Sequence, residues 1–98
     1  MYRHGDIIIQ PVLEIPSDAI KRPSKVLARG EATGHSHRIA ESSTALLYDK
    51  DGDGYLDVTS ESAELIHDEH KTITLPTGKY KFWKQREYSP TEIRSIVD

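Results

Sequence analysis

Short runs of hydrophobic residues, separated by turn residues, recur along the whole chain. No stretch keeps the 3.6-residue period of an amphipathic helix for twelve residues, whereas several runs alternate with the period of two that is typical of strands. The pattern predicts strands over 6–13, 26–28, 35–40, 44–48, 55–59, 64–67, 72–75 and 79–88. Many short strands joined by turns favour a small all-β barrel or sandwich of antiparallel strands.

Two of these segments are especially informative. Pro11 interrupts the β-branched run 6–13, which predicts an edge position or a bulge because proline cannot donate to a strand ladder. In 79–88, Tyr80 and Phe82 alternate with lysines, which predicts that the two rings face the core.

The connecting segments are defined by their turn residues. Residues 49–54 predict a hairpin tip and 76–78 a turn, whereas 15–25, with two prolines and two serines, predicts a surface loop. Residues 91–97 fit a short helix or a last strand, so we expect at most one short helix.

Composition limits the architecture to one domain. The chain has 98 residues, of which 36% are hydrophobic and 30% charged, so residues 1–98 predict a single β domain and exclude a doubly wound nucleotide fold. No apolar run approaches the length of about 20 residues that a membrane span needs, and the first residues lack the pattern of a secretory signal. We therefore expect a soluble cytoplasmic protein without a membrane association.

Histidine is the residue type that suggests chemistry. Cysteine is absent, which excludes thiolate catalysis and cysteine–zinc sites, but four of the five histidines form two close pairs. His35 and His37 would point to one face of a strand, and His67 and His70 would fold over them. Imidazole binds Zn, Fe, Mn and Ni, so we predict a divalent transition-metal site in which His35, His37 and His70 lead and His67 is the next candidate.

Other residues near the two pairs are candidates for supporting roles. Glu69 is available as a further ligand or as the carrier of a proton, and Glu31 is the second candidate proton carrier. His4 stands alone beside Arg3 and Gly5, so we expect it to be an ordinary exposed residue.

An acidic loop resembles the start of an EF-hand. Asp49, Asp51 and Asp53 occupy loop positions 1, 3 and 5. Position 12 is Ser60 instead of the bidentate glutamate, and the flanking segments predict strands instead of helices. We therefore expect a solvated hairpin tip and no calcium site.

A basic aromatic strand supports an alternative function. Residues 79–88 interleave cations with aromatic rings, a combination with which proteins bind single-stranded nucleic acids: the cations contact phosphates and the bases stack on the rings. The net charge of −3 argues against a general nucleic-acid binder, and the rings are equally expected in the core.

The motifs carry two resemblances. The run 30–39 (GEATGHSHRI), together with 67–70, 75–80 and 85–90, resembles a family of small uncharacterised bacterial proteins and implies no mechanism. The His35–His37 pair is similar to the first metal-binding motif of cupins, which are small β-barrels. The likeness departs from cupins in two places: no glycine follows Glu41 until Gly52, and the turn 76–78 lies after His70 instead of before it.

Several functions follow from these observations. The leading hypothesis is a metal-binding domain with hydrolytic or redox chemistry on a small-molecule substrate, functioning alone or as a homo-oligomer. The rival is a non-enzymatic module that binds a protein or nucleic acid through 79–88. A small accessory subunit without special histidine chemistry is the third.

Overall fold

Antiparallel strands make up most of the molecule. The computed structural model describes residues 1–29 and 35–85, which form eight strands and one short 3-10 helix. In chain order they are β1 (Tyr2–His4), β2 (Ile7–Val12), β3 (Ile20–Arg22), β4 (Val26–Arg29), β5 (Ser36–Ile39), the 3-10 helix η1 (Ser42–Thr44), β6 (Ala45–Lys50), β7 (Asp53–Ile66) and β8 (Ile73–Lys84). The predicted all-β class with at most one short helix is confirmed for these residues.

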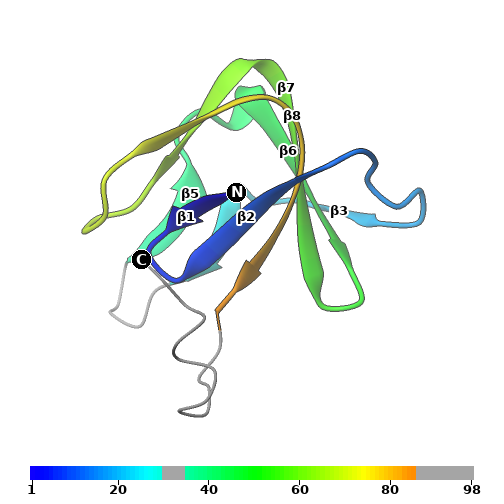
Figure 1. The fold of residues 1–98 in the computed structure, drawn as a ribbon, viewed down its shortest axis with the longest axis horizontal. Helices are drawn as coiled ribbons and strands as arrows, with labels where there is room; N and C mark the ends of the chain where they lie inside the picture. Colours follow the sequence, from blue (N-terminus) through cyan, green and yellow to red (C-terminus); the bar gives the residue numbers. More distant parts are fainter. Residues whose placement is uncertain (30–34, 86–98) are drawn as a thin grey trace.

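The strands form one sheet with the order β1-β2-β8-β7-β5-β4, and β6 and β3 extend it from the first part of β7. Every pairing is antiparallel. Figure 1 shows that β7 and β8 arch over the rest, so that the sheet bends strongly on itself. It stays open, because β1 and β4, at the ends of this order, are not paired with each other in the described part of the chain.

The long hairpin of β7 and β8 produces the bend. Its register shifts between the pairs Val58–Gly78 and Ser62–Pro76, where β7 carries extra residues. Buried side chains occupy even positions before this bulge, as at Leu56, and odd positions after it, as at Leu65. One hairpin therefore buries apolar side chains in both halves of the bent sheet.

This bend corrects two predictions. The sequence predicted separate strands over 55–59 and 64–67, and again over 72–75 and 79–88 with a turn at 76–78, whereas each pair is one continuous strand. The change of face at the bulge interrupts the period of two, and an interrupted period looks like the end of a strand. Strand β8 ends at Lys84, and residues 86–88 lie outside the described part of the chain.

The predicted loop over 15–25 is also corrected, because it contains β3. Ile20 and Lys21 are exposed, so this strand has no alternating signature. Its Arg22 instead bonds to the carboxylate of Asp49 and to the carbonyls of Val26 and Leu27. The predicted element over 91–97 lies outside the described residues.

Three further local predictions, for the hairpin tip, the two buried rings and Pro11, are confirmed. The tip between β6 and β7 is a two-residue turn with positive φ at Asp51 and Gly52, as a type I′ hairpin requires. Tyr80 and Phe82 are buried as their alternation predicted. Pro11 pairs with β8 on one side only, because β1 extends along β2 only as far as Ile9.

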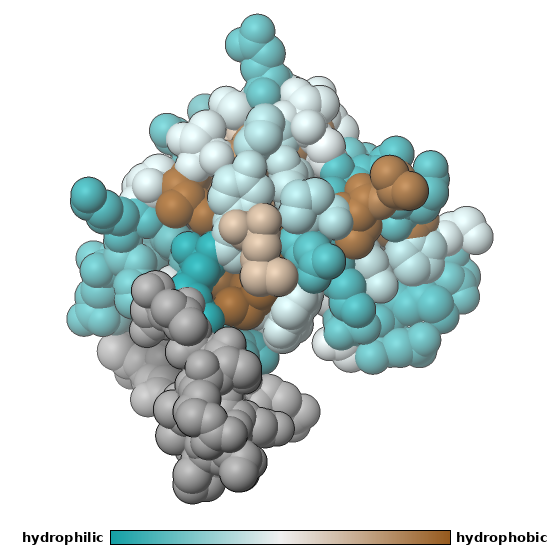
Figure 2. Space-filling model, viewed as in Figure 1, coloured by the Kyte–Doolittle hydropathy of each residue, from teal (hydrophilic) through white to brown (hydrophobic). Residues whose placement is uncertain are grey.

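Apolar side chains of both halves fill one core. It consists of Ile7, Ile9, Leu27, Ile39, Ala45, Leu47, Leu56, Val58, Ala63, Leu65, Leu75, Tyr80 and Phe82. The face in Figure 2 is mostly hydrophilic, with small separate apolar patches. Within the described residues no helix is long and apolar enough to cross a membrane.

Candidate metal centre

All five histidines of the chain gather at one place in the fold. His4 ends β1, His37 lies in β5, His35 comes just before β5, and His67 and His70 lie in the segment that joins β7 to β8. The centroid of the His37 ring lies 4.9 Å from that of His4, 4.4 Å from that of His67 and 5.6 Å from that of His70. Three chain segments that are distant in sequence therefore bring their imidazoles together.

Strand register explains the contact between His37 and His67. Arg38 pairs with Ile66 and Ile39 with Leu65, so the same register places His37 opposite His67. Arg38 also pairs with Asp68 at 2.9 Å, which fastens the segment after β7 to β5. The sheet thus fixes one imidazole and holds the second beside it.

The turn between β1 and β2 supplies space for the cluster. Gly5 has a φ of +62°, and a Cβ atom built on it would lie 2.7 Å from Nε2 of His70 and 3.0 Å from Cε1 of His37. A side chain at this position would displace one or both rings. Glycine therefore serves both the turn and the approach of the imidazoles.

Three of the four predicted ligands form a group that could hold an ion. His37, His67 and His70 each offer a nitrogen, and these atoms all lie within 4.8 Å of one another. His35 does not belong to this group: its ring lies 5.8 Å from that of His67, and its Nδ1 lies 3.8 Å from the Glu69 carboxylate. The structure thus separates the two histidines of the His-x-His pair.

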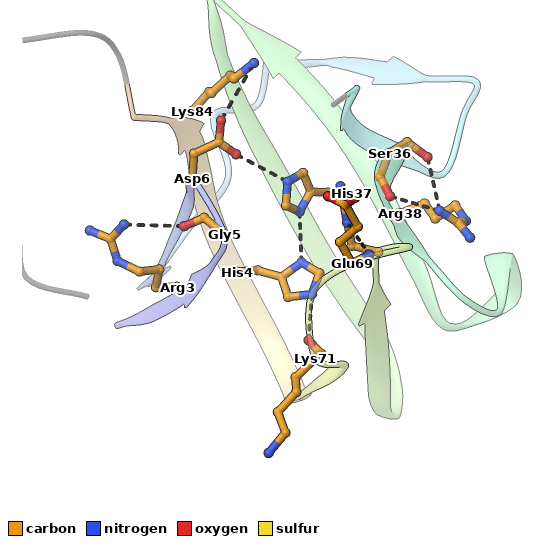
Figure 3. A network of polar contacts seen from close by, with 11 residues as sticks. Arg3, His4, Gly5, Asp6, Ser36, His37, Arg38, Glu69, Lys71 and Lys84 are labelled. Atoms are coloured by element: carbon orange, nitrogen blue, oxygen red, sulfur yellow. Dashed lines mark hydrogen bonds and ion pairs between the residues drawn. The ribbon is translucent and has the colours of Figure 1, made fainter. Parts of the chain in front are cut away.

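The expectation that His4 is exposed is wrong. Its relative exposure is 2%, its Nε2 lies 2.8 Å from the carbonyl oxygen of Lys71, and its Nδ1 lies 2.9 Å from Nδ1 of His37 (Figure 3). The sequence contained a signal for this. Gly5-Asp6 before the run Ile7–Ile9 is a two-residue hairpin turn, and such a turn places His4 on a strand beside the core.

Three histidines of the cluster, His4, His37 and His67, have a lowered pKa, which favours their neutral form. Burial, reinforced by the neighbouring imidazoles, lowers the pKa of His37 to about 4. Burial is also the main cause that lowers the pKa of His4 and of His67. Neutral imidazole is the form that binds metals, so protons compete little for these nitrogens near pH 7.

Of the two predicted proton carriers, Glu69 lies within the described residues and Glu31 does not. The carboxylate of Glu69 is mostly exposed, and its backbone N–H donates to Nδ1 of His67 at 2.9 Å. Ligation through that nitrogen would require this hydrogen bond to break. Glu31 lies outside the described residues.

The other candidate sites have intramolecular partners. In the EF-hand-like loop, Asp49 pairs with Arg22, Asp51 with Lys50 and Asp53 with Lys81. On the basic strand, Lys81 also lies 5.9 Å from the Trp83 ring, and Lys84 pairs with Asp6 at 3.8 Å. These contacts favour neither a calcium ion nor a nucleic acid over the histidine cluster.

Comparison with known proteins gives a family. Residues 3–85, which include every histidine, match the family described as "Domain of unknown function (DUF8820)". The chain belongs to the DUF8820 family. Searches of the curated proteins and of the solved structures give no match. The family description gives no activity, and the likeness to cupins stays a hypothesis.

Proposed function

We propose that this domain binds a divalent transition metal through His37, His67 and His70. The observation that supports this most is the convergence of their three nitrogens within 4.8 Å, drawn from β5 and from the β7–β8 connection. Closing the nitrogens around an ion requires contraction to about 3.3 Å, the separation in a tetrahedral site with bonds of about 2.0 Å. His70 is exposed and lies on a loop, so it has room to move inward.

Electrostatics favour the same proposal. Neutral imidazole is the form that binds a metal, and burial lowers the pKa of both His37 and His67, which favours that form. The donor set is entirely nitrogen among these three residues, which suits Zn, Ni, Fe or Mn better than calcium.

A metal held in this way would supply Lewis-acid or redox chemistry. Glu69 is placed to accept a proton near the cluster, because its exposed carboxylate lies 3.8 Å from His35. A small-molecule substrate would reach the cluster from the side of His70 and Glu69, which are exposed. The resemblance to cupins is reduced to His37, since Glu41 is exposed and borders η1.

Elemental analysis of untagged protein tests the proposal directly. We expect near-stoichiometric Zn, Fe, Mn or Ni, or a rise in melting temperature when one of these ions is added to metal-free protein. His37→Gln and His70→Gln should each reduce the affinity at least tenfold, whereas Lys21→Gln, far from the cluster on β3, should not change it. Metal-free protein whose melting temperature does not respond to any of the four ions would refute the proposal.

A further inference from the structure

We propose that a hollow beside β3 is a binding site for a small phosphate monoester, separate from the proposed metal centre. The hollow has a volume of about 300 Å³ and is lined by residues 21–25, by Ser42 and by residues 45–47. That volume lies at the lower end of the range for small-molecule sites. Among the described residues, its lining contains no histidine.

The hollow opens where β3 leaves the edge of β6. Strand β3 pairs with residues 47–49 of β6, whereas β6 begins at Ala45. After Arg22 the chain turns away to β4, which pairs with β5. Ala45 and Leu46 therefore pair with β7 on one side and border the hollow on the other.

Intramolecular bonds hold Arg22 in the wall of the hollow. Its guanidinium donates to the carboxylate of Asp49 and to the carbonyl oxygens of Val26 and Leu27. These bonds fix the turn between β3 and β4, which carries most of the lining. Because Asp49 balances the charge of Arg22, this residue shapes the hollow and adds little net charge to it.

The other two cations of the lining, Lys21 and Lys25, have no acidic partner. Both are exposed, and neither forms an ion pair within residues 1–29 and 35–85. The described lining contains no carboxylate either, although the chain as a whole has a net charge of −3. A concave surface with charges of one sign attracts ions of the opposite sign, so the hollow favours an anion.

The charges and hydroxyl groups of the lining favour a phosphate monoester over a carboxylate. A phosphate monoester carries about −1.5 to −2 charges near pH 7, which matches two lysines, whereas a carboxylate carries one. The hydroxyl oxygen of Ser24 accepts the N–H of Val26, so its proton remains available to a phosphate oxygen, and Ser42 supplies a second hydroxyl. Buried Ala45 and Leu47 add an apolar surface for the organic part of the ester.

Amide NMR of the ¹⁵N-labelled protein tests the proposal with phenyl phosphate as the probe. Phenyl sulfate is the matched control, because it has a similar shape but a single charge. We expect phenyl phosphate to shift the amide resonances of residues 21–25 and 42–47, and to bind at least tenfold more tightly than phenyl sulfate. Shifts confined to other segments, such as 67–71 at the histidines, would overturn the proposal, and so would equal affinities for the two probes.

Charge-removing variants give a second readout. Lys21→Gln and Lys25→Gln should each weaken the binding of phenyl phosphate about tenfold, and both should fold, because the two side chains are exposed. Lys71→Gln removes the same charge beside His70 and should leave the affinity unchanged. Affinities in Lys21→Gln and Lys25→Gln that equal that of Lys71→Gln would overturn the proposal.

Discussion

The glycine in the β1–β2 turn gives the sharpest test of the cluster, because Gly5→Ala disturbs the site without removing a ligand. The new methyl group would lie 2.7 Å from Nε2 of His70, whereas ordinary van der Waals contact begins at 3.4 Å. It would also lie 3.0 Å from Cε1 of buried His37. One ring atom must therefore retreat by about 0.7 Å.

Gly5→Ala should have two effects, a loss of folding stability and a loss of metal affinity, and a control variant separates them. A left-handed backbone costs alanine about 1–2 kcal/mol relative to glycine. Gly52→Ala carries that cost alone, because Gly52 has a φ of +86° and no atom within 4 Å of its Cβ position. In Gly5→Ala the exposed His70 ring yields first, so the extra loss falls on ligand geometry. Metal sites tolerate deviations of about 0.2 Å, so we expect the affinity to fall at least tenfold, or about 1.4 kcal/mol.

Isothermal titration of both variants with Zn²⁺, alongside urea unfolding of the metal-free proteins, measures the two parts. We expect similar losses of unfolding free energy in the two variants but a loss of metal affinity only in Gly5→Ala. Equal affinities in folded Gly5→Ala and Gly52→Ala would refute the reasoning that Gly5 makes room for the ligands.

Further predictions concern stability, ligand choice and core packing. Burial lowers the pKa of His37 to about 4 from the usual value of 6.5 for histidine, so the unfolded state binds more protons between these values. Metal-free protein should then lose about 3 kcal/mol of stability as the pH falls from 6.5 to 4, and a urea midpoint that is constant over this range would contradict the shift. Because His35 lies outside the group of three, His35→Gln should bind metal almost as wild type does and His70→Gln at least tenfold more weakly; the reverse order in titrations would contradict the grouping. A Cβ on Gly54 would lie 2.3 Å from Cζ of Phe82, so Gly54→Ala should lower the unfolding free energy by about 1–3 kcal/mol, and an unchanged melting temperature would contradict that packing.

Local patterns were sufficient to predict most strands but not their continuity. Alternation at Tyr80 and Phe82 gave the correct buried face, and Asp51-Gly52 gave the correct hairpin. The continuity of β7 through Thr59–Glu61 depends on a register shift in its pairing with β8, and such a shift is a property of the strand pair that neither segment shows by itself. Strand β3 was missed for a similar reason: its anchor is the contact between Arg22 and Asp49, 27 residues apart.

The candidate site, like the strands, was predictable only where local spacing determines it. The short spacing within each histidine pair marked His37, His67 and His70, because residues that are close in sequence share a strand or a loop. His35 and His37 are two residues apart, yet β5 begins only at Ser36, so the strand geometry that would align their rings does not extend to His35. His4 has no neighbouring histidine in sequence, and only the pairing of β1 with β2 brings it to the cluster.

The position of the cluster suggests why a domain with so small a core would keep it. Near the histidines, the buried positions of β1 and β5 include the polar side chains His4 and His37. An ion bound by His37, His67 and His70 would link β5 to the β7–β8 connection and close a loop of about 30 residues. Linking them in the folded state alone couples metal binding to folding, because the unfolded chain does not present a preformed site. If the proposed metal binding holds, the same imidazoles that make the metal-free domain sensitive to acid would make the loaded domain more stable, whether or not the metal also takes part in a reaction.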